Sequence, residues 1–469
     1  MNKYEKLMGN TLIFAIGSFS SKLLVFFMLG YYTAVLSPAE FGISDRITTT
    51  SNLLMPFVML SINEAVIRFA MDKTIRRSDV FTVGIKTVLV GFVVFLAVIP
   101  IMLRIEMIAP YTALIYAYVL FGMLKSVCAL FVRSIGYVRL FAIDGFIATG
   151  TTIGFNVLFL SGFKWGLNGY IISIIASNVF SILFLFIVAR LWRYLDFGRN
   201  VKQLQKEMLR YSIPLIPTTM FWWIINVSNR YMVTYFCGDD AAGLLAIACK
   251  IPSLLTIVSA IFYQAWQISA VSESGQGAST SKFYTRTYDY YGTLLFCAAS
   301  GIIMLIRPIT AILYDEAYHQ SWEFVPFLVI AEVFSSLITF LGSFYMVSKR
   351  NATVPLAIFI GAVINVAMNL LLIPDYGVLG AAFATLISYL LAFGIRAVDI
   401  KRLVTVKLDP LTTSIRFLVL MIQGAQLMKS EQYSFLAQLG IFFVMVLINL
   451  RPLMRVLFAL YDRFIPHRG

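Results

Sequence analysis

Long apolar runs, separated by short polar segments, follow one another along the whole chain. Each run is close to the length of about 20 residues with which a helix crosses a bilayer core of about 30 Å. Cutting the chain at charges and turn residues predicts fourteen membrane-spanning helices. They lie at 11–36, 43–66, 80–103, 108–132, 140–161, 167–190, 211–236, 243–269, 288–313, 323–347, 352–373, 377–397, 411–428 and 433–450.

The composition agrees with an all-α integral membrane protein. Of the 469 residues, 60% are hydrophobic and only 13% are charged, whereas soluble domains are about 45–50% apolar. The first run, 11–36, is longer than the apolar core of about 7–15 residues in a secretory signal peptide. We therefore expect it to be retained as the first helix.

The net charge of +14 does not indicate nucleic-acid binding, because the cations are scattered singly between apolar runs instead of clustering with aromatic residues. The four cysteines show no CxxC spacing, and the chain has only two histidines. We expect no disulfide, no metal site and no cofactor, and a histidine-dependent catalytic centre is disfavoured.

Lysine and arginine alternate between the two sides of the predicted helices. One side receives both termini and nearly all loop cations, whereas the loops of the other side carry only Arg104, Lys164, Arg307 and Lys429. Because cytoplasmic loops are enriched in Lys and Arg, both termini are predicted to be cytoplasmic. The basic segment 190–210 fits either a helix on the inner leaflet or a solvated linker.

The chain repeats itself after six spans. "NVLFLSGFKWGLNG" (156–169) resembles "NLLLIPDYGVLG" (369–380), and "YYTAVLSPAEFG" (31–42) can be laid on "YMVTYFCGDDAAG" (231–243). A repeat of an even number of spans predicts two six-helix lobes in one orientation around a central cavity. We assign 1–200 to the first lobe, 201–405 to the second, and 406–469 to two further helices and a cytoplasmic tail.

Charges inside the spans are candidates for function, because each costs about 2.5–3.5 kcal/mol on insertion scales. Lys22 lies eleven residues past Thr11, roughly 17 Å into the bilayer, which is too deep for its side chain to reach the interface. With Arg46, Arg230 and Lys250 it could line one basic cavity. Alternatively, Arg46 and Lys250 lie close enough to the outer interface to reach it.

Carboxylates inside the spans are candidates for ion coupling. These are Asp45, Asp144 and Glu332. Lys125 and Arg416 receive no role from the sequence. Prolines inside or at the ends of several spans predict bent helices.

Three segments, with the number of spans, resemble a known family. They are "LSPAEFGISDR" (36–46), "PDYGVLGAAFAT" (374–385) and "FYQAWQISAVSE" (262–273). Together they resemble the polysaccharide transporter (Wzx-like) oligosaccharide flippases of the multidrug/oligosaccharidyl-lipid/polysaccharide exporter (MOP) superfamily.

The resemblance implies a multi-pass protein of the bacterial cytoplasmic membrane. Such a protein moves a polyprenyl-pyrophosphate-linked oligosaccharide from the inner to the outer leaflet by alternating access. Lys22, Arg46, Arg230 and Lys250 are the residues expected to hold the pyrophosphate. Besides this substrate and the lipid bilayer, polysaccharide-assembly proteins are candidate partners.

Two other functions stay open. A polysaccharide polymerase or ligase is usually polytopic but carries a large outer loop, whereas every predicted outer loop here has about fifteen residues or fewer. A drug or cation antiporter of the same superfamily should carry unpaired carboxylates at mid-membrane and few cations. The chain shows the reverse.

Overall fold

The computed structural model describes residues 24, 26–72, 74–199, 201–256, 258–259, 262, 278–348, 354–402, 408–429 and 435–454. All regular elements in these ranges are helices, and no strand occurs among them. The predicted all-α class is therefore confirmed. Lys22 and most of the segment "FYQAWQISAVSE" lie outside the described residues.

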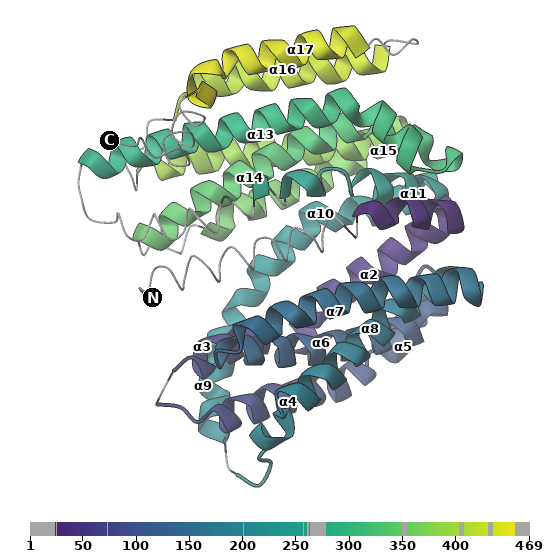
Figure 1. Cartoon of the computed structure of the whole chain (residues 1–469), viewed down its shortest axis with the longest axis vertical. Helices are drawn as coiled ribbons and strands as arrows, with labels where there is room; N and C mark the ends of the chain where they lie inside the picture. Colours follow the sequence, from purple (N-terminus) through teal and green to yellow (C-terminus); the bar gives the residue numbers. More distant parts are fainter. Residues whose placement is uncertain are drawn as a thin grey trace, which may run out of the picture. The chain divides into compact units, whose positions relative to one another are not determined.

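The chain divides into two compact units, Met1–Trp223 and Ile224–Gly469. In unit 1 a short apolar helix at Phe26–Val35 precedes the main bundle (Figure 1). The bundle and its connections consist of α2 (Pro38–Val58), α3 (Ile62–Ala70), α4 (Arg77–Leu96), α5 (Ile99–Met102), η1 (Ala109–Tyr111), α6 (Thr112–Ser134), α7 (Val138–Asn156), η2 (Val157–Gly162), α8 (Gly166–Val188), η3 (Leu191–Tyr194), α9 (Lys202–Ser212) and η4 (Ile213–Leu215).

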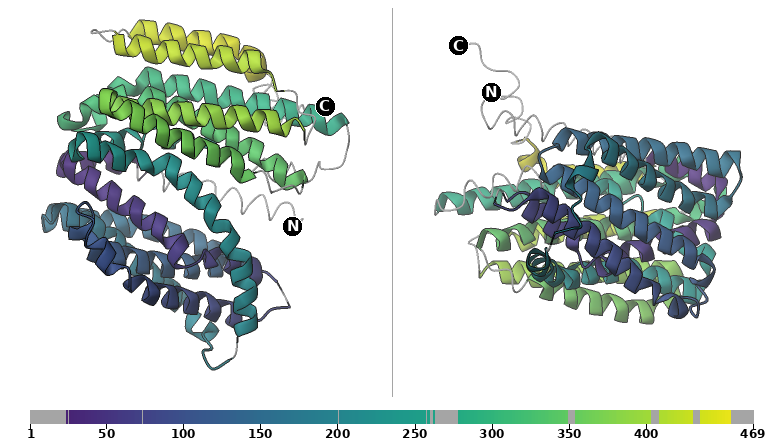
Figure 2. Two further views of the ribbon diagram at one scale, coloured as in Figure 1. Left: turned by 180° about the vertical axis from the view of Figure 1, so that it is seen from behind. Right: turned by 90° about the horizontal axis from the view of Figure 1, so that it is seen from below.

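The helix α10 (Ile216–Cys237) begins in unit 1 and continues into unit 2. Unit 2 continues with α11 (Asp239–Ala248), α13 (Ala278–Leu313), η5 (Glu316–Glu323), α14 (Val325–Ser348), α15 (Val354–Ile400), α16 (Pro410–Lys429) and α17 (Phe435–Ile448). Figures 1 and 2 show the pair α16 and α17 (yellow) running alongside α13, and all three helices contact one another.

The number of spans agrees with a polytopic membrane protein but does not confirm fourteen. Among the described residues, eight helices are long and apolar enough to cross a membrane, or nine if the bent pair α2 and α3 counts as one span. One of the eight, α15, contains a break at Gly377 and so covers both predicted spans 352–373 and 377–397. The helix α17 has only 14 residues, shorter than the predicted span 433–450.

A bend separates α2 from α3, as the proline positions predict. The two helices meet at 58°, and Pro56 lies in the last turn of α2. The amide of Ser61 donates to the carbonyl of Pro56 at 2.8 Å. The backbone at the bend is left-handed at Leu60 and Ser61, with φ of 52° and 49°. Such a bend keeps its backbone groups paired inside the protein, which a bilayer requires.

The two hairpins that carry the sequence repeat have matching glycines. Gly166 and Gly377 both adopt a left-handed backbone, with φ of 52° and 56°, a conformation that favours glycine. A Cβ on Gly169 or Gly380 would lie only 3.1 or 2.4 Å from a carbonyl oxygen of the preceding helix. The positive φ of the first glycine and the close backbone contact of the second therefore recur at aligned positions, as an internal repeat predicts.

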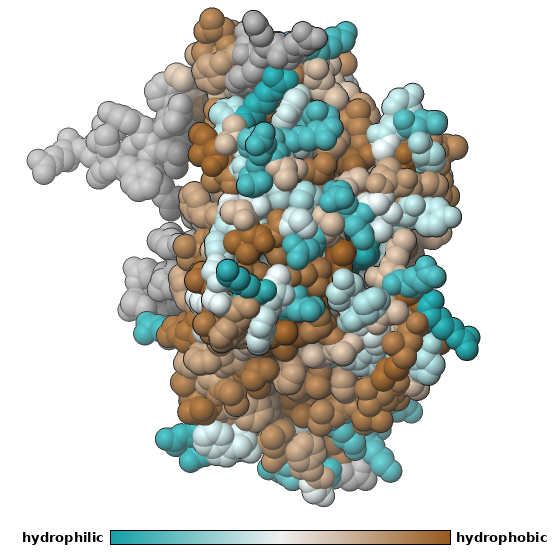
Figure 3. Space-filling view, turned by 90° about the vertical axis from the view of Figure 1, so that its right-hand side faces the viewer, coloured by the Kyte–Doolittle hydropathy of each residue, from teal (hydrophilic) through white to brown (hydrophobic). Residues whose placement is uncertain are grey.

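Large apolar side chains cover much of the surface. Val93, Ile187, Leu371 and Leu447 are between 64% and 67% exposed, and Figure 3 shows hydrophobic residues (brown) over a large part of the face in view. Soluble monomers rarely expose contiguous apolar surfaces of this extent. These side chains suit contact with lipid tails.

Candidate functional site

The start of α2 fixes the position of two candidate site residues. The Ser37 hydroxyl accepts from the Glu40 amide at 3.3 Å, and the Glu40 carboxylate accepts from the Ser37 amide at 3.0 Å. This capping box, with Pro38 as the first helical residue, begins the helix at the segment "LSPAE". Asp45 and Arg46 follow two turns later, and each is only 5% exposed.

Threonine side chains follow these two residues along α2 and bond to their backbone carbonyls. Thr49 donates to the Asp45 carbonyl at 2.7 Å and Thr50 donates to the Arg46 carbonyl at 2.6 Å. The Trp223 indole in turn donates to the Thr49 carbonyl at 3.2 Å. Side-chain hydroxyls that bond to the preceding turn satisfy themselves within the helix and tend to bend it. The contact with Trp223 links the beginning of α10 to this polar stretch.

Asp144 lies in a buried polar cluster of unit 1. It is 3% exposed, it accepts a hydrogen bond from Ser181 of α8, and the Lys125 ammonium of α6 attracts it electrostatically. The three residues join α6, α7 and α8, which pack against each other. Sequence reasoning left Lys125 without a role, and the structure makes it a neighbour of Asp144.

The remaining predicted site residues belong to unit 2. Arg230 lies in α10, Lys250 lies two residues past the end of α11, and both are half-buried. Glu332 of α14 accepts from Thr256 at 3.0 Å and from Ser336 at 3.4 Å. A single cavity lined by Lys22, Arg46, Arg230 and Lys250 stays a prediction, as does ion coupling by the three carboxylates.

A cluster of asparagines in unit 2 was missed by the sequence reasoning. Ser228 donates to the Asn365 side-chain oxygen at 3.1 Å, and Asn369 donates to the same oxygen at 3.0 Å. Asn229 donates to Thr385 at 3.2 Å. The signal was present as the i, i+4 pair in "NVAMN" within an apolar run. Neutral amides draw less attention than charges in such a run.

The asparagine cluster has unused hydrogen-bonding capacity. Asn229, Asn365 and Asn369 are at most 2% exposed. The side-chain oxygens of Asn229 and Asn369 have no hydrogen-bond partner among the described residues. Buried amide oxygens of this kind can accept from water or coordinate a small cation. Within the described part of the chain, no group of three or more His, Cys, Asp or Glu side chains could hold a metal ion.

Asn156 occupies the matching place in unit 1. It aligns with Asn369 in the sequence repeat, and both are fully buried. Asn156 donates to the Tyr32 hydroxyl at 3.1 Å and accepts from Ser173 at 2.8 Å. A buried asparagine therefore precedes the hairpin in each unit, although its hydrogen-bond partners differ.

A ladder of polar contacts joins α13 to the C-terminal helices. Arg416 donates to Asp289 at 2.9 Å and to Thr293 at 3.0 Å. Further along, Ser300 donates to Gln423 at 2.7 Å. Interhelical hydrogen bonds of this kind hold helices together where no hydrophobic effect separates protein from lipid. Within unit 2, α16 is thus attached to α13 by specific polar contacts.

The comparisons with known proteins agree with this architecture. Residues 7–267 match the family model described as polysaccharide biosynthesis protein. Among solved structures, a "lipid II flippase MurJ, inward closed conformation" has a TM-score of 0.73 at 16% identity, with 95% of this chain and 100% of that chain covered. No curated protein sequence matches the chain.

Two further structures come from transporters of the MOP superfamily. An inward-facing multidrug resistance MATE family transporter has a TM-score of 0.64 at 15% identity and covers 83% of this chain and 98% of its own. A MOP superfamily transporter from Pyrococcus furiosus, described as having a binding pocket of reverse polarity, has a TM-score of 0.52 at 16% identity, with 84% of this chain and 95% of that chain covered. At these identities the likeness shows the fold.

The family model covers more than half of the chain, and the fold matches are to membrane flippases and transporters along most of its length. The resemblance inferred from the sequence motifs is thereby confirmed at the level of family and fold. The chain belongs to the polysaccharide biosynthesis protein family and has the fold of MOP-superfamily flippases and transporters.

Proposed function

We propose that the protein flips a polyprenyl-pyrophosphate-linked oligosaccharide from the inner to the outer leaflet of the bacterial cytoplasmic membrane by alternating access. The observation that carries this proposal is the match of residues 7–267 to a polysaccharide biosynthesis family in a chain with a flippase fold. A membrane protein of that family has to act on a sugar-bearing substrate at the membrane. A lipid carrier is the form in which a polar oligosaccharide can be held there.

The charge distribution supports an anionic headgroup. Arg46 lies within α2 at 5% exposure, and Arg230 and Lys250 add half-buried cations in unit 2. A cation in low dielectric gains strongly from a diphosphate, and guanidinium groups suit its oxygens. In this proposal Lys22, Arg46, Arg230 and Lys250 bind the pyrophosphate, while Asp45, Asp144 and Glu332 are the candidates for coupling to an ion.

A test of this function begins with deletion of the gene in its host. We expect lipid-linked oligosaccharide to accumulate on the cytoplasmic leaflet, and the wild-type gene to restore its outward transfer. Lys22→Ala should abolish transfer, while Lys22→Arg keeps a cation and should retain part of it. Arg46→Ala should also reduce transfer. The measurement is the fraction of lipid-linked oligosaccharide accessible to a membrane-impermeant sugar-oxidising reagent in spheroplasts.

Arg104→Ala is the matched control, because Arg104 is an exposed cation in a loop between helices and its loss should change nothing. The amount of each variant in the membrane is measured by immunoblot, so that loss of transfer is separated from loss of protein. Full transfer by Lys22→Ala would show that Lys22 does not bind the substrate and has only a structural role. An unchanged lipid-linked pool together with retention of a cationic dye would favour the drug antiporter instead.

We also propose that both termini lie in the cytoplasm, because the loops on their side carry nearly all the loop cations. Green fluorescent protein fused after Gly469 should therefore fluoresce, since it matures in the cytoplasm. Alkaline phosphatase inserted after Gly238 should be active, because that loop is predicted to lie outside. The reverse pattern of the two reporters would contradict the orientation.

A further inference from the structure

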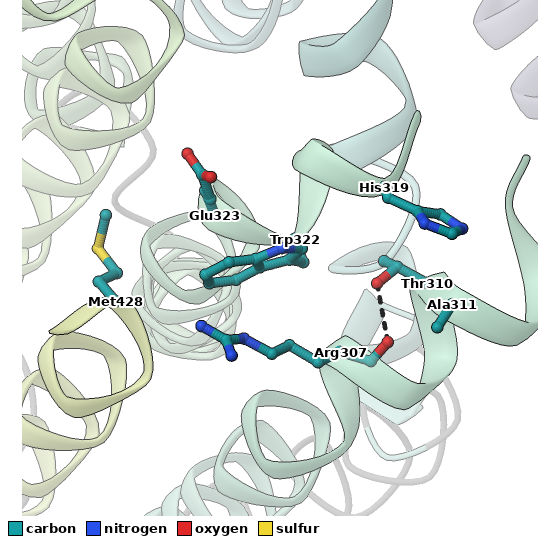
Figure 4. A pocket seen from close by; sticks show the side chains of 7 residues that line it. All are labelled: Arg307, Thr310, Ala311, His319, Trp322, Glu323 and Met428. Carbon is teal, nitrogen blue, oxygen red and sulfur yellow. Dashed lines mark hydrogen bonds between the residues drawn. The ribbon is translucent and has the colours of Figure 1, made fainter. Parts of the chain in front are cut away.

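A cavity of about 550 Å³ opens at one end of unit 2, within the range of about 300–1,000 Å³ of small-molecule sites. It lies between the end of α13, the 3₁₀ helix η5 and the end of α16 (Figure 4). Its lining includes Arg307, Thr310, His319, Trp322, Glu323 and Met428. The helix α11, whose first turn carries Asp239 and Asp240 of the acidic segment "CGDDAAG", packs on η5. The cavity is therefore on the side that the loop charges predict to be outside.

The periodicity of η5 explains why its polar and aromatic residues face the cavity. In a 3₁₀ helix, residues three apart share one face. Tyr318 and Ser321 are fully buried and anchor one face of η5. His319 and Trp322, one position further along, share the next face and line the cavity. Asp315 caps the start of η5 by accepting from the Ala317 amide at 3.2 Å.

Arg307 holds the central aromatic ring in place. Its guanidinium lies 4.0 Å from the centroid of the Trp322 ring, and it donates to the Leu427 carbonyl at 2.8 Å. Figure 4 shows Trp322 between Arg307 and Glu323. Because Arg307 covers one face of the indole, a ligand in the cavity would meet the other face or the ring edge. The indole is thus a fixed wall rather than a mobile side chain.

The lining combines this apolar wall with groups that accept hydrogen bonds. The Glu323 carboxylate is an acceptor. The Nε2 atom of His319 lies 3.0 Å from the Tyr314 carbonyl oxygen, which can only accept, so Nε2 is assigned as the donor and Nδ1 is the ring atom on which a ligand can form a hydrogen bond. A sugar ring presents C–H groups on one face and hydroxyl donors at its edge. The C–H face matches the indole of Trp322, and the hydroxyl donors match the acceptors of Glu323 and His319.

Other ligand classes match less well. The charges of Arg307 and Glu323 cancel, and Arg307 is already engaged with Trp322 and Leu427, which disfavours a phosphate. A lipid tail would leave the carboxylate of Glu323 unsolvated. A cationic ligand on the other face of the indole would be repelled by the Arg307 guanidinium, which lies 4.0 Å from the ring centroid.

We propose that this cavity binds a terminal mono- or disaccharide unit of the exported oligosaccharide on the outer side of the membrane. The proposal rests on the proposed function, because it takes the sugar to be part of the transported molecule. Binding there would hold the sugar after it has crossed and oppose its return.

The test is saturation-transfer NMR on the purified full-length protein in detergent, with methyl glycosides of glucose, galactose, rhamnose and N-acetylglucosamine as probes. At least one probe should receive saturation from the wild-type protein. Trp322→Ala and Glu323→Gln should each weaken binding of that probe by roughly tenfold, a change of about 1.4 kcal/mol. Glu323→Gln keeps the shape of the side chain, so its effect does not depend on a change in folding.

Trp192→Phe is the control, because Trp192 is an exposed tryptophan of unit 1 far in sequence from the cavity. It should bind the probe as the wild type does. The inference is overturned if no probe binds the wild type, if Trp322→Ala and Glu323→Gln both bind equally well, or if inorganic phosphate displaces the sugar. These results test only the binding of sugars to the cavity, not the transfer of the oligosaccharide across the membrane. The proposed function fails separately, when deletion of the gene leaves the lipid-linked pool unchanged.

Discussion

Replacing Asp289 by asparagine should destabilise the protein more than replacing Arg416 by methionine, although the two side chains form one ion pair. The Nη2 atom of Arg416 lies 2.9 Å from the Asp289 carboxylate, and the two side chains are 3% and 43% exposed. Asp289→Asn leaves a guanidinium buried without its anion. Arg416→Met leaves a carboxylate that water can reach.

The expected magnitudes follow from this difference in exposure. Removing one partner of a fully buried pair costs about 3–5 kcal/mol. Because Asp289 is half-exposed, solvent screening lowers the cost of its loss to about 1–3 kcal/mol. Methionine refills part of the apolar volume of the arginine stem, so Arg416→Met should cost less, about 1 kcal/mol. The double variant should resemble Arg416→Met alone.

The double-mutant cycle is measured by thermal unfolding of the purified protein. The readout is the fraction of the protein that remains monodisperse after heating. Gln426→Ala on the same helix is a useful control for general damage to α16, because the hydrogen bond of Gln426 is to Gln438 of α17. Equal destabilisation by both single variants would show that the buried charge is not the dominant effect. The cycle thereby tests whether α16 and α17 are held to α13 by this pair.

The sequence pattern predicts those structural features that depend on residues close together in the chain. Apolar runs of span length predict the helices, because every backbone group must be paired within a bilayer. The glycines of the two hairpins are also predictable. "FKWGLNG" and "PDYGVLG" place glycines at the same spacing, and the structure gives both Gly166 and Gly377 a positive φ.

The polar contacts between helices were not predictable in the same way. Arg416 and Asp289 are separated by 127 positions, and Arg307 and Trp322 meet only because η5 folds back over the end of α13. A charge in an apolar run signals that a partner is needed. It does not say which of the other helices supplies that partner.

Replacing Gly91 by alanine should disturb the bend between α2 and α3 and lower the amount of folded protein. A Cβ at Gly91 would lie 1.9 Å from the carbonyl oxygen of Val58, far inside van der Waals contact. Val58 is the last residue of α2, directly before the bend of 58°. Because the obstacle is backbone and not the end of a side chain, α4 or the bend itself must move.

Overpacking of this kind costs about 1–3 kcal/mol or more. Gly145→Ala is the matched control, because nothing lies within 4 Å of a Cβ there, and alanine in an open helical position should stabilise by about 0.5–1 kcal/mol. The two variants are compared by melting temperature and by the export of lipid-linked oligosaccharide that the proposed function implies. Gly91→Ala could melt like the wild type but export less of the oligosaccharide. In that case the bend serves the motion of α2, the helix that carries Arg46, more than the stability of unit 1. Normal melting together with normal export would show that the contact between α4 and the end of α2 can relax without consequence.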